Sequence, residues 1–508
     1  MAKNKRQAEF GDFQTPDSLA GQICEFLAAK GVQPAAVLEP TCGVGALLLA
    51  AMRQFPSIQY GWGFDINPSY IDQATARAQD LRCSPQPQFS TANFFDAEWG
   101  KLIAESPRPL LILGNPPWVT NSELSTLESE NVPTKSNSQN LRGLDALTGK
   151  SNFDISEWML LKMLDWLQQS EAMLAMLCKT SVARRVLAQA WKTGLRLQQV
   201  ELRAINAAEH FGAAVDACLL YCQSGAASSV PEADCFRNLS SAPPIGRIGL
   251  RGDELVADAN AYDQTYRFIQ KMPKKRPLWR SGIKHDCASV MELQKIGGQY
   301  VNRLGESLEL EPNYLFPLLK SSDVAGDSPI QPRYWMLVPQ QGVGVETENI
   351  ERAAPRTWDY LQRHGLRLDN RKSSIYRNRP RFSIFGVGDY SFAPWKVAIS
   401  GFYKRLQFSV ISGFEGKPIV FDDTVYFLPC STQSQAEKLA EILNAPIAQD
   451  FLACRVFWDS KRPITVDLLQ RLSLELLAEE LGYPLSLPLD YQPSRNDAET
   501  TKRQTVLF

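Results

Sequence analysis

Histidine is scarce in this chain, and its cysteines do not form metal-binding pairs. Three of the 508 residues are histidine, His210, His285 and His364, and none of the ten cysteines stands in a CxxC pair. Zinc sites need Cys and His residues at short, paired spacings, so the sequence predicts no metal site. We interpret the cysteines as reduced, mostly buried thiols.

Long apolar segments and repeats are also missing. No uninterrupted apolar run approaches the roughly 18 residues of a transmembrane helix. Residues Met1 to Arg6 lack the apolar core of a signal peptide, and no repeat or low-complexity block follows. We therefore expect a cytoplasmic protein without a membrane partner.

The composition is that of an ordinary globular protein. Lys and Arg number 54 against 55 Asp and Glu, which gives a net charge of −1, and 44% of the residues are hydrophobic. A chain of this length exceeds the usual single domain, and we expect two large ones. The near-zero charge excludes little, because it averages over segments that differ strongly.

The most informative stretch runs from Leu110 to Trp118. It reads Leu-Leu-Ile-Leu-Gly-Asn-Pro-Pro-Trp, so an apolar run typical of a buried parallel strand ends at a rigid polar corner. Pro116 and Pro117 offer no N–H, which leaves the Asn115 side-chain oxygen and the Pro116 carbonyl as acceptors for one NH2 group. Trp118 adds a flat ring for stacking. Together they suit a planar ring that bears an amine, such as adenine or cytosine.

A glycine-rich turn follows the first predicted strand. The segment Glu39-Pro40-Thr41-Cys42-Gly43-Val44-Gly45 separates a short apolar run from a helix. Glycines there let a backbone approach a ligand closely. The full GxGxxG of dinucleotide-binding folds is missing, and an acid at the strand end suits a cationic ligand better than a pyrophosphate.

The ends of the next two strands carry further polar residues. Asp65 comes twenty residues after the turn, at the spacing where an acid hydrogen-bonds ribose hydroxyls. Asn93 and Phe94 follow the third strand, and an amide beside a ring suits the reading and stacking of adenine. Near the start of the chain, Thr15 is placed to cap an amphipathic helix.

These elements predict an α/β fold, a doubly wound and mostly parallel sheet that ends in an antiparallel hairpin. His210-Phe211-Gly212 joins the two strands of the hairpin. We expect strands at residues 35–38, 60–64, 89–92, 110–114, 172–177, 198–205 and 215–222.

The rest of the chain sets the domain boundaries. From Val119 to Lys150 periodicity fails, which indicates a long loop directly after the corner. We predict a first domain at 1–225, a Ser-, Ala-, Pro- and Gly-rich linker region at 226–265, an α+β domain at 266–492 and a polar tail at 493–508.

Basic and aromatic residues interleave in the second domain. Nine Arg or Lys residues stand against two acids between positions 352 and 381, namely 352, 356, 363, 367, 371, 372, 377, 379 and 381. Such runs are often merely solvated, but the aromatic neighbours favour nucleic-acid binding. The residues that we expect to bind DNA are Arg377, Arg379, Arg381, Lys396, Lys404 and Arg405.

The order of these motifs resembles that of the amino-methylating DNA methyltransferases in their gamma arrangement, in which a target-recognition domain comes last. The resemblance implies an adenine-N6-specific enzyme of a restriction-modification system, with S-adenosylmethionine as cofactor and double-stranded DNA as partner. It places the protein at a bacterial nucleoid, and it leaves open a separately encoded restriction nuclease or other defence-system subunit.

The resemblance also assigns roles to the quoted residues. Those matching the positions that hold the methionine part are Thr15, Glu39, Thr41, Gly43 and Gly45, with Asp65 on the ribose and Asn93 and Phe94 on the adenine. Asn93 departs from the acid often found there. The catalytic corner is Asn115, Pro116, Pro117 and Trp118. The target base would leave the duplex, stack on Trp118 and meet Phe211 on its other side.

Other functions stay open on these residues. Cytosine-N4 methylation needs the same amine chemistry, but such enzymes usually resemble a Ser-Pro-Pro variant. Methylation of RNA or of a protein glutamine also uses Asn-Pro-Pro corners, although a glutamine substrate needs no basic, aromatic surface. A non-catalytic DNA-binding subunit would not need an intact corner and glycine turn. Short fragments of nuclease motifs at 415–417 and 459–461 carry little weight, and we predict no cleavage.

Overall fold

The computed structural model describes residues 13–119, 154–168, 171–225, 230–270, 278–326 and 330–483. The chain divides into two units, Met1–Asn260 and Ala261–Phe508. Within the described ranges, no helix is long and apolar enough to cross a membrane. In the same ranges, no group of His, Cys, Asp or Glu side chains is arranged to hold a metal ion.

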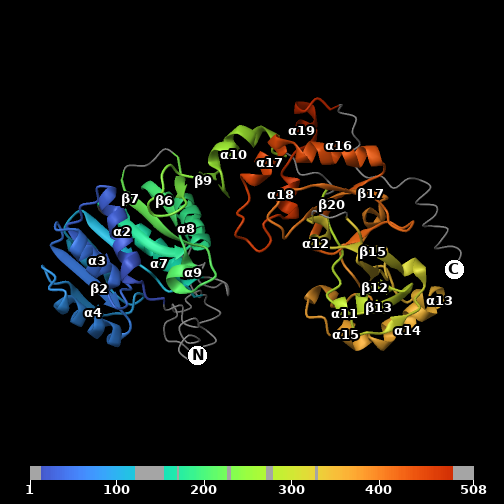
Figure 1. The fold of residues 1–508 in the computed structure, drawn as a ribbon, viewed down its shortest axis with the longest axis horizontal. Helices are drawn as coiled ribbons and strands as arrows, with labels where there is room; N and C mark the ends of the chain where they lie inside the picture. Colours follow the sequence, from blue (N-terminus) through green and yellow to red (C-terminus); the bar gives the residue numbers. More distant parts are fainter. Residues whose placement is uncertain are drawn as a thin grey trace. The chain divides into compact units, whose positions relative to one another are not determined.

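The first unit is built on one ten-stranded sheet (Figure 1). Its strands lie in the order β10-β9-β8-β6-β7-β5-β4-β1-β2-β3. Strands β5, β4, β1, β2 and β3 run parallel, whereas β7 is antiparallel to both of its neighbours. The strands are β1 Ala36–Glu39, β2 Tyr60–Asp65, β3 Gln88–Thr91, β4 Leu110–Gly114, β5 Ala172–Lys179, β6 Leu197–Ile205, β7 Ala217–Ser224, β8 Glu232–Phe236, β9 Gly246–Arg251 and β10 Glu254–Val256. The predicted α/β fold is confirmed, and each predicted strand is present.

Helices cover the sheet on both faces. Leu111 and Leu113 of β4 pack with helices α2 and α3. Leu110 and Ile112, which alternate with them along the strand, are equally buried. A parallel strand buried on both sides reads as a continuous apolar run, which explains the sequence of β4. The helices of this unit are α2 Asp17–Ala29, α3 Ala46–Gln54, α4 Pro68–Asp80, α5 Trp99–Glu105, α7 Ile155–Leu167, α8 Thr180–Lys192 and α9 Ala207–Phe211.

The structure differs from the predicted linker at 226–265. Strands β8, β9 and β10 lie in this segment, and β8 pairs in parallel with β6. The β6–β7 hairpin therefore lies inside the sheet instead of at its edge. The Ser- and Pro-rich stretch that suggested a linker includes the connection between β8 and β9, whereas Ala233 and Ile248 are buried core residues of those strands. The first unit thus extends to Asn260.

The second unit contains two smaller sheets and short helices, in agreement with the predicted α+β class. One sheet has the order β11-β20-β17-β18 and the other β14-β13-β12-β16-β15-β19. The strands are β11 Arg280–Ser281, β12 Glu292–Ile296, β13 Gln299–Asn302, β14 Ser307–Leu308, β15 Leu315–Leu319, β16 Tyr334–Leu337, β17 Trp395–Ser400, β18 Ser409–Ile411, β19 Val420–Phe421 and β20 Val425–Cys430.

Helices pack on each sheet of this unit. Residues of α16, α17 and α19 share a core with the sheet that contains β17 and β20. The helices are α10 Ala259–Thr265, which begins in the first unit, α11 Ala288–Met291, α12 Ser321–Val324, α13 Ile350–Ala353, α14 Pro355–Arg363, α15 Gly365–Asp369, α16 Gln433–Asn444, α17 Pro446–Ala453, α18 Val466–Gln470 and α19 Leu474–Glu480. The predicted long loop, beyond Val119, and the predicted tail at 493–508 lie outside the described residues.

Candidate active site

The predicted site residues of the first unit meet at the carboxyl edge of the sheet. Strands β4, β1, β2 and β3 are neighbours and parallel, so the segments that follow them emerge side by side. These segments carry Asn115, the glycine turn, Asp65 and Asn93. A Cβ placed on Gly114 would lie 3.8 Å from Cγ of Glu39, which brings the polar corner next to the turn. Ligands in open α/β sheets bind at this edge.

The Asn115 amide is oriented by the segment before α2. Its Nδ2 donates to the carbonyl of Phe13 at 2.8 Å and to the hydroxyl of Thr15 at 3.4 Å. Its Oδ1 is buried and has no hydrogen-bond partner among the described residues. Exchanging the two amide atoms would place two acceptors 2.8 Å apart, so this orientation is the stable one. The amide therefore presents an unused acceptor.

Three aromatic rings form a cluster at the corner, and one of them belongs to Phe13, whose carbonyl accepts from the Asn115 amide. The Trp118 ring is 5.5 Å from Phe13 and 5.2 Å from Phe211, measured between centroids, and Phe13 is 5.9 Å from Phe211. Trp118 is 5% exposed, and its Nε1 has no partner within the described part of the chain. The chain after the corner is fixed as well, because Ile155 N of α7 donates to the carbonyl of Val119 at 3.1 Å.

The glycine turn places an acid at the start of α3. Glu39 is 2% exposed, and its Oε2 accepts from Leu48 N at 2.9 Å. Burial raises the pKa of the Glu39 carboxyl well above its ordinary value. Gly43 and Gly45 have φ values of 51° and 78°, a region that favours glycine. The buried Thr41 Oγ1 lacks a partner in the described chain, so the turn presents both an acid and an unused hydroxyl.

Asp65 links the ends of β1 and β2. Its carboxylate accepts from Gly43 N at 2.9 Å and from Asn67 N at 2.8 Å. Asn93 lies close to Asp65, because Ala92 N, directly before Asn93, donates to the carbonyl of Asp65. Oδ1 of Asn93 accepts from Phe95 N at 3.0 Å.

Phe94 is less available than its predicted role requires. Its ring is 5% exposed and packs on the rings of Phe95, Trp99, Trp158 and Trp166 at 5.5 to 6.0 Å. The surface that it can offer to a ligand is therefore small.

The segment from Phe13 to Pro16 is where sequence reasoning missed most. Helix α2 begins at Asp17 with Pro16 as its N-cap, and no side chain caps it, so the predicted cap by Thr15 is wrong. Instead Gln14 Oε1 accepts from Val44 N at 3.1 Å, and Phe13 joins the aromatic cluster. The signal available in the sequence was an aromatic residue and an amide directly before a helix start.

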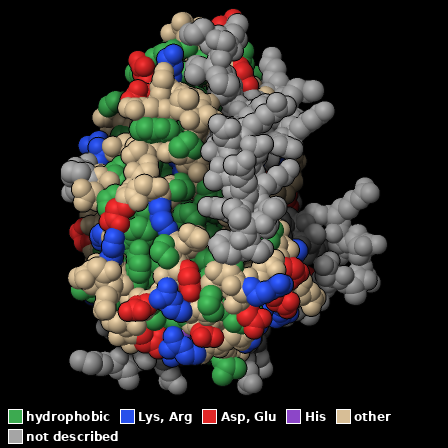
Figure 2. Space-filling model, turned by 90° about the vertical axis from the view of Figure 1, so that its right-hand side faces the viewer, with side chains coloured by type: hydrophobic (Ala, Val, Ile, Leu, Met, Phe, Trp, Pro, Cys, Tyr) green, Lys and Arg blue, Asp and Glu red, His purple; other side chains and the backbone are tan. Residues whose placement is uncertain are grey.

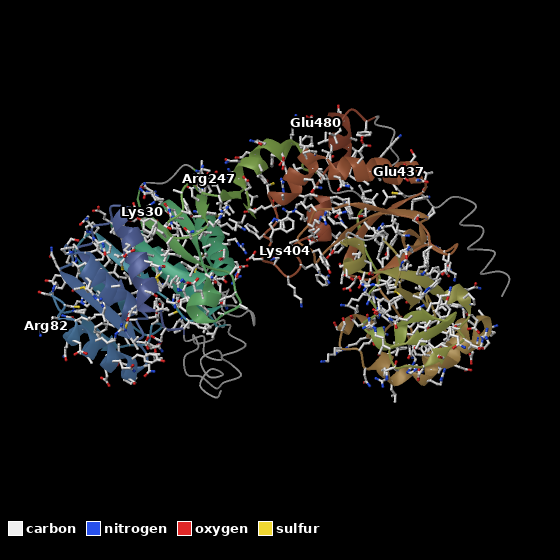
Figure 3. The ribbon with its side chains drawn as sticks, in the orientation of Figure 1. Lys30, Arg82, Arg247, Lys404, Glu437 and Glu480 are labelled. Atoms are coloured by element: carbon white, nitrogen blue, oxygen red, sulfur yellow. The ribbon has the colours of Figure 1, made fainter. Side chains whose placement is uncertain are left out.

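The predicted DNA-binding residues of the second unit have different surroundings. Arg377, Arg379, Lys404 and Arg405 are exposed, and Lys404 lies at the margin of its unit (Figure 3). Arg381 pairs with Asp369 at 2.9 Å, which neutralises part of its charge.

Lys396 does not lie on the surface, so its predicted contact with DNA is wrong. It points into the core from β17, where it is 1% exposed, and its Nζ donates to the carbonyl of Ala393 at 2.6 Å. The alternation of side chains along a strand decides this, and it places Lys396 on a buried face.

Comparison with known proteins supplies the family. The sequence is 44% identical over 482 residues to the type II methyltransferase M.NspV of Nostoc sp., and the match covers 94% of this chain and 98% of the relative. The chain belongs to the type II methyltransferase family. No protein-family model matches it.

Solved structures give weaker likenesses to this type II methyltransferase. The type IIL restriction-modification enzyme MmeI in complex with DNA is 14% identical, with 96% of this chain and 76% of that chain covered and a TM-score of 0.49. A type I restriction-modification methyltransferase subunit from Streptococcus thermophilus is 15% identical, over 44% of this chain and 47% of that one, with a TM-score of 0.30. The family assignment rests on the sequence match. It supports the predicted restriction-modification methyltransferase and its expected cofactor, S-adenosylmethionine.

Proposed function

We propose that this protein transfers a methyl group from S-adenosylmethionine to the exocyclic N6 of an adenine that has left a specific duplex DNA sequence. The observation that carries the proposal is the unpartnered Oδ1 of Asn115, next to the Pro116 carbonyl and three aromatic rings. Acceptors on two consecutive residues, together with a cluster of rings at the same corner, suit a flat base that bears an amine. Protection of host DNA in a restriction-modification system is the expected role.

The residues at the carboxyl edge fit S-adenosylmethionine. Glu39 would take the positively charged methionine part, and Thr41 Oγ1 offers a buried hydroxyl without another partner in the described chain. Gly43 has a φ of 51°, and a Cβ there would lie 2.2 Å from Gln14 Oε1, so a larger residue would strain the turn and displace the Gln14 amide from it. Asp65 would bind the ribose, and the loop at Asn93 would bind the adenine ring of the cofactor. When bound, S-adenosylmethionine supplies an electrophilic methyl group on a cationic sulfur.

The two acceptors at the corner would activate the target amine. The lone pair of an exocyclic amine is delocalised into its ring, so the nitrogen is a poor nucleophile. Hydrogen bonds from the amine to Asn115 Oδ1 and the Pro116 carbonyl would draw its hydrogens out of the ring plane and localise the lone pair. No strong base is needed, because preorganised acceptors and positioning lower the barrier.

The aromatic cluster would hold the base. A flipped base loses its stacking in the duplex, and side-chain rings restore part of that energy. Trp118 follows β4 and Phe211 precedes β7, the two strands that flank β5, and the centroids of their rings are 5.2 Å apart. A base would enter by separating these rings from each other or from Phe13.

Cytosine-N4 methylation is the second candidate, since the same acceptors would serve a cytosine amine. The test incubates the full-length protein with DNA and tritiated S-adenosylmethionine, digests the DNA to nucleosides and separates them. Label on N6-methyl-2′-deoxyadenosine supports the proposal. Label on N4-methylcytosine, on RNA or on protein would overturn it.

A further inference from the structure

The basic strip at 352–381 is less uniform than its sequence suggests. Arg356 pairs with Glu309 at 3.6 Å and with Glu311 at 3.3 Å, and Arg381 pairs with Asp369. Figure 2 shows the same mixture on one face of the second unit, where Lys and Arg side chains lie beside Asp and Glu. By contrast, Arg377 and Arg379 are exposed and form no ion pair with any described residue. Arg377 and Arg379, on the loop after Tyr376, thus belong to the basic residues of the strip that no described acid neutralises, together with Arg352, Arg363, Arg367 and Lys372.

A half-buried arginine, Arg371, holds this loop in place. Arg371 donates to the carbonyls of Leu368 at 2.7 Å, His285 at 3.1 Å and Ser383 at 2.7 Å. Its guanidinium also lies 3.6 Å from the ring centroid of Tyr376. A guanidinium that bonds three segments and stacks on a ring restricts all of them, since its planar fork fits one arrangement.

Both ends of the loop are anchored while its tip is exposed. Tyr376 packs edge-on against Phe385, with centroids 5.5 Å apart, and Phe382 is 1% exposed. Thr347 Oγ1 donates to the carbonyl of Arg381 at 2.6 Å. Between these anchors, Arg377, Asn378 and Arg379 are all exposed.

Asn378 is the residue at the tip. Its φ is 56°, in the left-handed region that asparagine tolerates better than most residues. Its amide makes no hydrogen bond to the described residues. An asparagine amide matches the N6 and N7 edge of adenine, and a guanidinium matches the O6 and N7 edge of guanine.

We propose that residues 377–379 form a base-reading loop, in which Asn378 determines specificity for one base of the recognised site and Arg371 positions the loop. The inference rests on the proposed function, because it takes duplex DNA as the substrate. Arg377 and Arg379 then flank Asn378 as contacts to neighbouring bases or phosphates.

The experiment starts from the site that the full-length wild-type protein methylates, found by sequencing methylated DNA. Initial rates of methyl transfer are measured on this site and on every single-base variant of it. For Asn378→Ala and Asn378→Gly we expect the preference at one position to fall by about 10- to 100-fold, with unchanged preference elsewhere. The glycine variant keeps the left-handed backbone accessible, so agreement between the two assigns the effect to the amide. Asn349→Ala, at another exposed asparagine of the same unit, should keep every preference.

Arg371 is tested by Arg371→Met with Arg455→Met as its matched control. Like Arg371, Arg455 donates to a backbone carbonyl and lies over a ring: it bonds the Phe451 carbonyl at 2.6 Å and lies 3.7 Å from the Phe451 ring centroid. Arg455 is buried whereas Arg371 is half-buried, and it follows α17, away from the loop. Both variants should melt at a lower temperature. Only Arg371→Met should relax the preference at the position that Asn378 reads.

The two failures are distinguishable. If the wild-type protein methylates no DNA, the proposed function itself fails. If it is active and site-specific, yet both Asn378 variants keep the preference at every position, the base-reading loop is refuted while DNA methylation stands. Equal relaxation in Arg371→Met and Arg455→Met would refute the positioning role.

Discussion

Replacing Asn115 by alanine removes the acceptor on which the proposed chemistry depends. Loss of one preorganised polar contact at a reacting centre costs about 2.7 to 4 kcal/mol in barrier, so turnover should fall about 100- to 1,000-fold. The same change leaves the Phe13 carbonyl, now bonded at 2.8 Å, without its donor. That loss costs about 1 to 3 kcal/mol of folding stability, which most domains survive.

The assay measures single-turnover methyl transfer to DNA that carries the identified site, with cofactor and DNA at saturation. Neither ligand depends on the Asn115 oxygen for its main contacts, so both should still bind to the variant. At saturation the measured rate therefore reports the methyl-transfer step and not a change in binding. Asn238→Ala is the matched control, an exposed asparagine of the same unit whose Oδ1 accepts from Ser240 N at 3.1 Å. It should retain wild-type turnover. Near-normal turnover in Asn115→Ala would refute the role of the acceptor.

Three further predictions address other parts of the molecule. Burial raises the pKa of Glu39, and a cationic ligand binds the ionised form of this carboxyl better. Affinity for S-adenosylmethionine should therefore increase as pH rises above the ordinary pKa of a Glu side chain. Calorimetry should show that the affinity of Glu39→Gln no longer depends on pH in this range. Burial lowers the pKa of Lys396 from 10.5 to about 7, so the unfolded state holds this proton more tightly than the folded state does. The lysine therefore lowers the free energy of unfolding fully below pH 7, and this loss disappears as pH rises from about 7 to 10.5. At about 1.4 kcal/mol per pKa unit, the Lys396→Met variant should exceed the wild-type protein in free energy of unfolding below pH 7 by at most about 5 kcal/mol. Chemical denaturation below pH 7 measures this, and equal stability of variant and wild type would contradict the prediction. Neutralising Arg377 and Arg379 should reduce the log–log salt slope of DNA binding by about one for each lost phosphate contact, and an unchanged slope would leave them as solvated residues.

Strands β1, β4 and β5 could be read from the sequence because they are buried on both faces of the sheet. The continuous apolar run of β4 and the residues after β1 and β2 carried that information locally. The cap by Thr15 could not be decided in this way, because its alternative partner, Asn115, lies 100 residues away. Contacts of that kind depend on the tertiary fold and leave no periodic trace.

Two errors had a similar cause. Lys396 looked like part of a basic surface, but the pairing of β17 with β18 and β20 turns it into the core. The segment with β8 to β10 looked like a linker because its strands are short and its connections are rich in Ser and Pro. A fragment ending near Gly225 would remove β8, one of the two partners of β6, and expose core residues, so an isolated first unit should run through Asn260.

The short segment before α2, residues 13–16, contacts both the glycine turn of the proposed cofactor site and the corner proposed to bind the target base. Gln14 holds Val44 of the glycine turn, while Phe13 and Thr15 hold the amide and ring of the corner. Whichever ligand binds first would order these residues, and the second would then bind to a segment that is already ordered. Thermodynamic reciprocity makes the effect symmetric, so DNA should tighten cofactor binding by the same factor as cofactor tightens DNA binding. Four residues at the start of the described chain would thereby make the two substrates cooperative.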